Sequence, residues 1–222
     1  MLVMGIDDSG RGPIIGPMIL AGVLIDKKSE EILKKHGVRD SKQVLHPKRM
    51  QLARIIKELA ISYYVVKAYP EEIDSMLRKG TNLNTVEAIK TAEIINELNK
   101  KKDKITVVVD CPSNNKSAWK NNLSTFIDNQ ENLSLLCEHK ADVNHVVVSA
   151  ASILAKVARE EEVEELKKKY GDFGSGYPAD PYTKKFLQEH GERLKNSGIF
   201  RRSWQTWKRL YPEKDQGTLK DF

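Results

Sequence analysis

The chain has few cysteines, and the two that it has, Cys111 and Cys137, form neither a disulfide framework nor a metal-site spacing. No apolar run approaches the length needed to cross a bilayer. The first residues lack a basic segment followed by an apolar region and a small-residue cleavage site. We therefore expect no signal peptide, no membrane association, and a cytoplasmic protein whose cysteines are reduced core residues.

The sequence also has no internal repeat and no low-complexity segment, so a repeat architecture is excluded. Its 222 residues, 40% hydrophobic and 31% charged, are typical of one globular domain with room for a small appendage. The formal net charge is +6 and the isoelectric point about 9.1. This mildly basic balance permits a polyanionic partner without establishing one.

The first seventeen residues combine a buried strand, two acids and a glycine loop. An apolar run over residues 2–6 predicts a core strand, and Asp7 and Asp8 follow it directly. The glycine- and proline-rich residues 9–13 then break regular structure. Two carboxylates this close raise each other's pKa, and a divalent cation with oxygen ligands relieves that penalty. A strand end followed by a solvated turn is the alternative interpretation.

The rest of the pattern predicts an α/β protein with five strands. The strands are expected at 2–6, 18–25, 61–69, 104–110 and 133–137, with helices at 29–35, from Pro47, from Pro70 to Gly80, 84–100, 114–127, 149–169 and 182–194. Asn84 followed by Glu87 is typical of a capping box, so we expect Asn84 to cap the helix over 84–100.

Two further aspartates follow predicted strands. Asp110 ends the apolar run over 104–110, and Asp142 comes shortly after the strand over 133–137. Sites in open α/β sheets gather outside the carboxyl ends of strands. Several strands that each deliver an acid at that end favour a shared site more strongly than any one of them does alone.

Residues 199–210 interleave Arg201, Arg202, Lys208 and Arg209 with two tryptophans. This composition suits a phosphate backbone and stacked bases. An amphipathic helix that packs its tryptophans on the main domain is the alternative, and the two are compatible if the cations face outward.

Six sequence blocks in order make the chain resemble ribonuclease HII, the type 2 ribonuclease H family, in its archaeal form. The blocks are GIDDSGRGPIIGPM at 5–18, DSK at 40–42, VVVD at 107–110, HKAD at 139–142, SAASILAK at 149–156 and GSGYPADP at 174–181. The resemblance implies a ribonuclease H-like fold: a five-stranded mixed sheet flanked by helices, with a small helical C-terminal region. It divides the chain into a catalytic domain (1–182), a helical substrate-binding region (183–210) and a flexible tail (211–222).

The resemblance implies a metal-dependent endoribonuclease. Such enzymes hydrolyse the phosphodiester 5′ of a ribonucleotide, in RNA–DNA hybrids or embedded in duplex DNA, and leave 3′-hydroxyl and 5′-phosphate ends. The carboxylates carried over are Asp7, Asp8, Asp110 and Asp142. They are expected to hold two divalent ions, Mg²⁺ or Mn²⁺, about 4 Å apart, which activate the attacking water and stabilise the leaving oxygen.

Substrate-binding roles carry over as well. Gly10, Arg11 and Gly12 match the block whose backbone approaches the ribose 2′-hydroxyl, the group that distinguishes RNA from DNA. Tyr177 matches the tyrosine that packs on the sugar at the RNA–DNA junction. The positions expected to contact the substrate backbone are Lys42, Lys140, Ser152 and Lys156.

Asp8 departs from the family pattern, which has Glu at this position, and the shorter side chain affects metal geometry. We expect activity to survive, with an altered rate or metal preference. A hybrid-binding protein of the same fold with weakened catalysis is the alternative. A third interpretation, a nucleotide-binding α/β domain with a phosphate-binding loop over residues 10–16, is rejected because neither a Lys-Ser/Thr pair nor dinucleotide glycine spacing follows.

The tail carries a second motif. Gln216, Leu219 and Phe222 have the spacing of a sliding-clamp-binding box, in which one helical turn inserts apolar side chains into a pocket. A polar tail that matches by chance is the alternative. Nothing in the sequence indicates an oligomer, so we expect a monomer.

Overall fold

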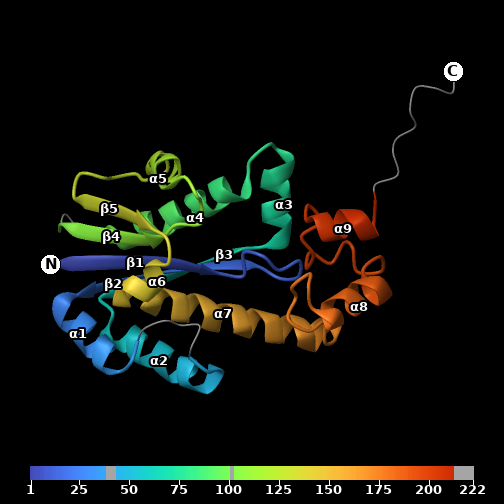
Figure 1. Cartoon of the computed structure of the whole chain (residues 1–222), viewed down its shortest axis with the longest axis horizontal. Helices are drawn as coiled ribbons and strands as arrows, with labels where there is room; N and C mark the ends of the chain where they lie inside the picture. Colours follow the sequence, from blue (N-terminus) through green and yellow to red (C-terminus); the bar gives the residue numbers. More distant parts are fainter. Residues whose placement is uncertain (39–43, 101–102, 213–222) are drawn as a thin grey trace.

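The computed structural model describes residues 1–38, 44–100 and 103–212, and it is built around one five-stranded sheet in the order β3-β2-β1-β4-β5 (Figure 1). The strands are β1 (Leu2–Ser9), β2 (Met18–Asp26), β3 (Ser62–Ala68), β4 (Ile105–Asp110) and β5 (Leu133–Glu138). All five expected strands are present. β1 pairs antiparallel with β2 and β2 with β3, whereas β4 and β5 run parallel to β1.

Helices cover both faces of this sheet (Figure 1). In the described chain they are α1 (Lys27–Lys35), α2 (His46–Leu59), α3 (Pro70–Arg78), α4 (Leu83–Leu98), α5 (Lys116–Ser124), α6 (Ala141–Asn144), α7 (Val146–Tyr170), α8 (Pro181–His190) and α9 (Gln205–Leu210). α4 and α5 lie on one face, and α1, α2 and α7 on the other. The mixed α/β sheet expected from the sequence is confirmed, and none of the described helices could traverse a bilayer.

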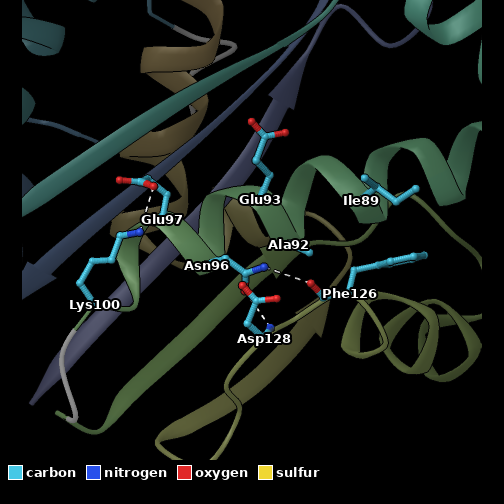
Figure 2. Close-up of a pocket in the computed structure, with 8 residues that line it drawn as sticks. All are labelled: Ile89, Ala92, Glu93, Asn96, Glu97, Lys100, Phe126 and Asp128. Atoms are coloured by element: carbon cyan, nitrogen blue, oxygen red, sulfur yellow. Dashed lines mark hydrogen bonds and ion pairs between the residues drawn. The ribbon is translucent and has the colours of Figure 1, made fainter.

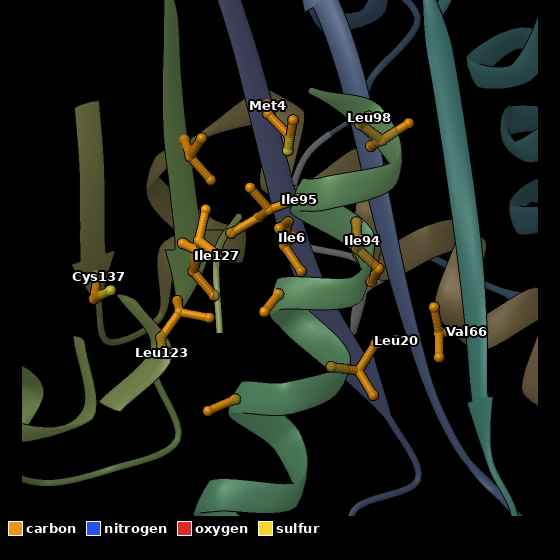
Figure 3. Close-up of a cluster of buried hydrophobic side chains, with 14 of the residues drawn as sticks. Met4, Ile6, Leu20, Val66, Ile94, Ile95, Leu98, Leu123, Ile127 and Cys137 are labelled. Atoms are coloured by element: carbon orange, nitrogen blue, oxygen red, sulfur yellow. The ribbon is translucent and has the colours of Figure 1, made fainter. Parts of the chain in front are cut away.

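Two cores sandwich the sheet because successive strand residues point to opposite faces. Met4 and Ile6 of β1 join α4 and α5 residues such as Ile94 and Leu123 in one core (Figure 3). The opposite core is centred on α7. α7 lies so close to β1 that a Cβ on Gly5 would stand 2.4 Å from the backbone of Val147. β1 is therefore closely packed on both faces just before the residues at its carboxyl end.

Several helix boundaries differ from the expected ones. α1 begins two residues early because the Asp26 carboxylate accepts a 2.8 Å hydrogen bond from the Ser29 amide and caps the helix. The prediction that Asn84 caps α4 is wrong, since Asn82 does so by accepting from the Thr85 amide. The charged second half of α7 is solvated as expected, and α7 begins at Val146.

The C-terminal region packs beyond the carboxyl end of β1 (Figure 1). A third core joins Ile14 and Ile15, which follow the glycine loop, to aromatic residues that include Phe173, Phe186 and Trp207. Residues 199–210 form no single amphipathic helix, because Phe200 bridges to Ile15 and only residues 205–210 are helical. The expectation that the cations of this segment face outward fails at Arg201, which is fully buried.

Candidate functional site

The predicted carboxylates come from three elements that meet at the carboxyl edge of the sheet. Asp7 lies near the end of β1, Asp110 ends β4, and Asp142 lies in α6 directly after β5. Ile6 pairs with Val109 in the parallel register, so Asp7 and Asp110 are the next neighbours on adjacent strands. Asp7 and Asp142 are buried, at 7% and 2% exposure. The structure thus gathers acids that are far apart in sequence.

The register also separates Asp7 from Asp8. Asp7 pairs with Ala21, which belongs to the α7 core, whereas Asp8 pairs with Leu20, which belongs to the α4 core. The two acids therefore leave β1 on opposite faces, as strand alternation requires. Across the described residues, no group of three or more His, Cys, Asp or Glu side chains is arranged so that it could hold a metal ion.

Electrostatics at this edge oppose full ionisation. Burial raises the pKa of Asp7 well above its ordinary value, and the charges of Asp8 and Asp110 add to the rise. Burial likewise raises the pKa of Asp8 from 3.8 to about 6, against the lowering effect of Arg11. Buried acids that repel one another need a cation nearby in order to be ionised together. The oxygen donors fit Mg²⁺ or Mn²⁺ in type and charge.

Local hydrogen bonds hold the acids in place. The Asp8 amide donates to Oδ1 of Asp7 over 2.7 Å, and the Ala141 amide donates to Oδ1 of Asp110 over 2.9 Å. Ser152 is 1% exposed, and its hydrogen bond to Asp7 lowers the pKa of that acid. Ser152 was expected to contact the substrate backbone, and in the structure it forms a hydrogen bond with the Asp7 carboxylate.

The two lysines near the acids differ in setting. Lys156 of α7 is half-buried, and its charge lowers the pKa of Asp8. Lys140 is exposed and adopts the left-handed conformation, with φ of 58°, directly before α6. Both therefore border the edge where the carboxylates lie.

The glycine loop and Tyr177 meet beside the acids. A Cβ on Gly12 would stand 3.4 Å from the Tyr177 ring, which is 42% exposed. Gly10 has a φ of 84°, and a Cβ there would stand 2.4 Å from Nε of Arg159. Glycine is therefore required at position 10 for both conformation and space. The Arg159 guanidinium stacks 5.4 Å from the Tyr177 ring centroid.

Sequence reasoning missed the residues that anchor this loop. The Arg11 side chain forms an ion pair with Glu87 and donates a 2.7 Å hydrogen bond to Asn84, both on α4. Glu87 is only 2% exposed. The available sequence signal was an acid between the apolar residues Val86 and Ala88, but its spacing from Asn84 also fits a capping box.

Arg201 and Trp204 were also missed as loop contacts, because their composition indicated a surface for phosphates. Arg201 donates hydrogen bonds to backbone carbonyls of the glycine loop, and Trp204 donates to Gly12. No sequence signal distinguishes Arg201 from the exposed Arg202 beside it.

Lys42, and the tail residues Gln216, Leu219 and Phe222, lie outside the described residues. A groove of about 550 Å³ along α4 is lined by Ile89, Glu93 and Asn96 of the helix and by Phe126 and Asp128 (Figure 2). None of the predicted site residues lines it. Cys111 and Cys137 are buried and free, as expected for core residues.

Comparisons with known proteins agree with these observations. The family model of ribonuclease HII matches residues 4–207. Ribonuclease HII of Pyrococcus furiosus is 43% identical over 230 residues, covering 100% of this chain and 98% of that protein. The crystal structure of ribonuclease H2 from Pyrococcus horikoshii has a TM-score of 0.84 at 37% identity, covering 95% of this chain and 97% of the other. A ribonuclease HII solved in complex with PCNA, from Archaeoglobus fulgidus, has a TM-score of 0.81 at 36% identity, with both chains fully covered.

Proposed function

The chain belongs to the ribonuclease HII family, and from that premise we propose that Asp7, Asp8, Asp110 and Asp142 are the catalytic carboxylates of this endoribonuclease. As a member of the family, the protein is a hydrolase that cleaves phosphodiester bonds in RNA–DNA hybrids. We assign cleavage to the 5′ side of a ribonucleotide, in hybrids and at ribonucleotides embedded in duplex DNA, with 3′-hydroxyl and 5′-phosphate products. The observation that carries the assignment is the position of Asp7 and Asp110 near the carboxyl ends of adjacent parallel strands, with the glycine loop directly after β1.

Divalent metal dependence goes with membership of the family. We propose that the four aspartates hold two ions, Mg²⁺ or Mn²⁺, and the raised pKa values of Asp7 and Asp8 support this because a cation relieves the repulsion between neighbouring carboxylates. When bound, the metal supplies Lewis acidity at the scissile phosphate and at the attacking water. The protein's part is to keep the carboxylates ionised and fixed: Ser152 holds Asp7, and the Ala141 amide holds Asp110.

Substrate recognition is proposed to involve the loop and the aromatic ring beside it. Gly10, Arg11 and Gly12 present backbone to the ribose 2′-hydroxyl, and Tyr177 packs on the same sugar. The contact of Gly12 with the Tyr177 ring supports a joint role. Lys42, Lys140 and Lys156 are assigned to backbone phosphates.

The domain division is also a proposal. Residues 1–182 carry the chemistry, and residues 183–210 support the substrate with exposed cations that include Arg202, Lys208 and Arg209. If these cations contact phosphates, affinity for duplex falls steeply as salt rises.

A single cleavage experiment tests the assignment. The protein is incubated with a DNA duplex that carries one ribonucleotide, with and without Mg²⁺ or Mn²⁺. We expect a metal-dependent nick on the 5′ side of the ribonucleotide. The Asp110→Asn variant should bind the duplex but not nick it, whereas Asp103→Asn, at an exposed acid, serves as the matched control with unchanged nicking.

The alternative function is hybrid binding with weakened catalysis, for which Asp8 is the specific observation, because a shorter acid stands where the family has Glu. It predicts that the unsubstituted protein binds the ribonucleotide duplex but shows no metal-dependent nick. In that case the four carboxylates are not a working catalytic set.

We also propose that the tail binds a sliding clamp through Gln216, Leu219 and Phe222. The related ribonuclease HII solved with PCNA, a sliding clamp, supports this. Removing residues 216–222 should abolish clamp binding in a pull-down or by calorimetry while nicking of short duplexes is retained. Clamp affinity that survives the deletion would refute the proposal.

A further inference from the structure

The buried side chain of Arg201 forms hydrogen bonds to the backbone of the glycine loop. Its side chain is 0% exposed, and its guanidinium donates to Gly10 O over 2.6 Å and to Arg11 O over 2.7 Å. Two further hydrogen bonds reach Gly16 O, over 3.0 and 3.1 Å. The planar fork of arginine therefore fixes three carbonyl groups at the same time, two in the glycine loop and one at Gly16 shortly after it.

Fixed carbonyls also fix the amides that share their peptide planes. The described chain contains no cis peptide bond, and in a trans peptide the carbonyl and the next N–H point in opposite directions. The bond to Gly10 O therefore turns the Arg11 N–H away from Arg201, and the bond to Arg11 O does the same for the Gly12 N–H. These two amides face the opposite side of the loop from the buried guanidinium.

Trp204 completes the restraint at the end of the loop. Its indole Nε1 donates to Gly12 O over 3.1 Å, and the Arg201 guanidinium lies 4.9 Å from the Trp204 ring centroid. The residue after Gly12 is Pro13, which has no N–H, so this bond turns no amide outward. The Trp204 bond instead holds Gly12 in place. The Tyr177 ring lies on the side of Gly12 where a Cβ atom would stand.

Asp74 of α3 fixes the backbone between these two side chains. Its carboxylate accepts hydrogen bonds from the Arg202 amide over 2.7 Å and from the Ser203 amide over 3.0 Å, and also accepts one from the Ser203 hydroxyl. Asp74 is 3% exposed. Because these bonds go to Arg202 and Ser203, the buried carboxylate fixes the segment that has Arg201 at one end and Trp204 at the other.

We propose that Arg201, held by Asp74, is a positioning residue for ribose recognition, because it orients the Arg11 and Gly12 amides toward the substrate's 2′-hydroxyl. This inference rests on the proposed function of the loop. It gives the C-terminal segment a role in selecting the ribonucleotide. This role is separate from any contact between the exposed cations of the segment and phosphates.

The test separates positioning from general binding in the Arg201→Lys variant, which keeps the charge but loses the fork. Single-turnover nicking of a duplex with one ribonucleotide gives the rate at saturating protein, and competition by an all-DNA duplex gives its inhibition constant. We expect the rate to fall about tenfold, the effect of losing one well-oriented hydrogen bond. The inhibition constant should stay within about twofold, because phosphate contacts are untouched.

The Arg54→Lys variant is the matched control, because it makes the same substitution at an exposed arginine of α2 that has no part in the proposed site. It should leave both the saturating rate and the inhibition constant of the all-DNA duplex unchanged. If Arg201→Lys does not fold by circular dichroism, Asp74→Asn replaces it, with a smaller fall in rate expected and the same inhibition constant.

An unchanged saturating rate in the variant tested, or a loss of rate matched by an equal loss of all-DNA affinity, overturns the positioning role. Absence of metal-dependent nicking by the unsubstituted protein refutes the proposed function instead, so the two failures are distinguishable.

Discussion

Replacing Asp8 with Asn should stabilise the metal-free protein at neutral pH. Burial raises the pKa of Asp8 from 3.8 to about 6, so above pH 6 the folded state must hold a charge that water would solvate better. The folded pKa lies above the unfolded one, so the stability linked to Asp8 is fully present below about pH 4 and is lost as pH rises through about 6. Asparagine removes that loss.

The magnitude follows from the shift. A rise of about two units corresponds to at most about 3 kcal/mol, at 1.36 kcal/mol per unit. Part of this free energy comes from repulsion by Asp110, whose charge also raises the pKa of Asp8, and solvent reduces it further because Asp8 is partly exposed. We therefore expect Asp8→Asn to gain about 1–2 kcal/mol of stability at pH 8.

Urea unfolding in EDTA at pH 8 and pH 4 measures the effect. The gain of Asp8→Asn should be present at pH 8 and absent at pH 4, while Asp103→Asn, at an exposed acid, should be neutral at both. Added Mg²⁺ or Mn²⁺ should stabilise the unsubstituted protein more than Asp8→Asn, because the metal binds the ionised acid in the folded state. A variant less stable than the parent at pH 8 would show that the Asp8 charge is already compensated in the metal-free fold.

Three other substitutions test the site. Asp8→Glu should keep metal-dependent nicking and raise its rate, by up to the roughly hundredfold that a misplacement of about 1 Å can cost; abolished nicking would mean that Asp8 does not fill the role of the family's Glu. Ser152→Ala should raise the pKa of Asp7 further and lower the nicking rate about tenfold at the acidic end of the pH profile, with recovery as pH rises; a uniform loss at all pH values contradicts this. Glu87→Gln should lower the unfolding free energy by about 2 kcal/mol in urea, because it leaves the half-buried Arg11 without its partner charge; an unchanged midpoint would mean that the ion pair contributes nothing.

The strand pattern was readable from the sequence because local chemistry decides it. Short apolar runs such as those at β1 and β4, which end at turn residues, are typical of strands buried on both faces of a sheet. The acid that follows each run then lies at a carboxyl edge wherever the parallel strands meet. The six ordered blocks that carry the resemblance to ribonuclease HII are likewise short stretches of chain, so the family was readable at the same level.

Helix ends were less readable, since several polar residues competed for the same cap. Asn82 and Asn84 are equally suited by type, and only packing decided between them, because Asn84 accepts instead from Arg11. The same packing assigned Glu87 to an ion pair that no local pattern distinguishes from a capping box.

What the sequence by itself determined is the set of strands, the acids at their ends and the glycine loop, because each depends on residues close together in the chain. What only the tertiary structure decided is which side each group faces and what holds it. The register sends Asp7 and Asp8 to opposite faces of β1. Arg201 reaches carbonyls 185 to 191 residues away, although the next residue, Arg202, is an exposed cation. A buried partner of this kind is fixed by how distant segments pack, and no local pattern records it.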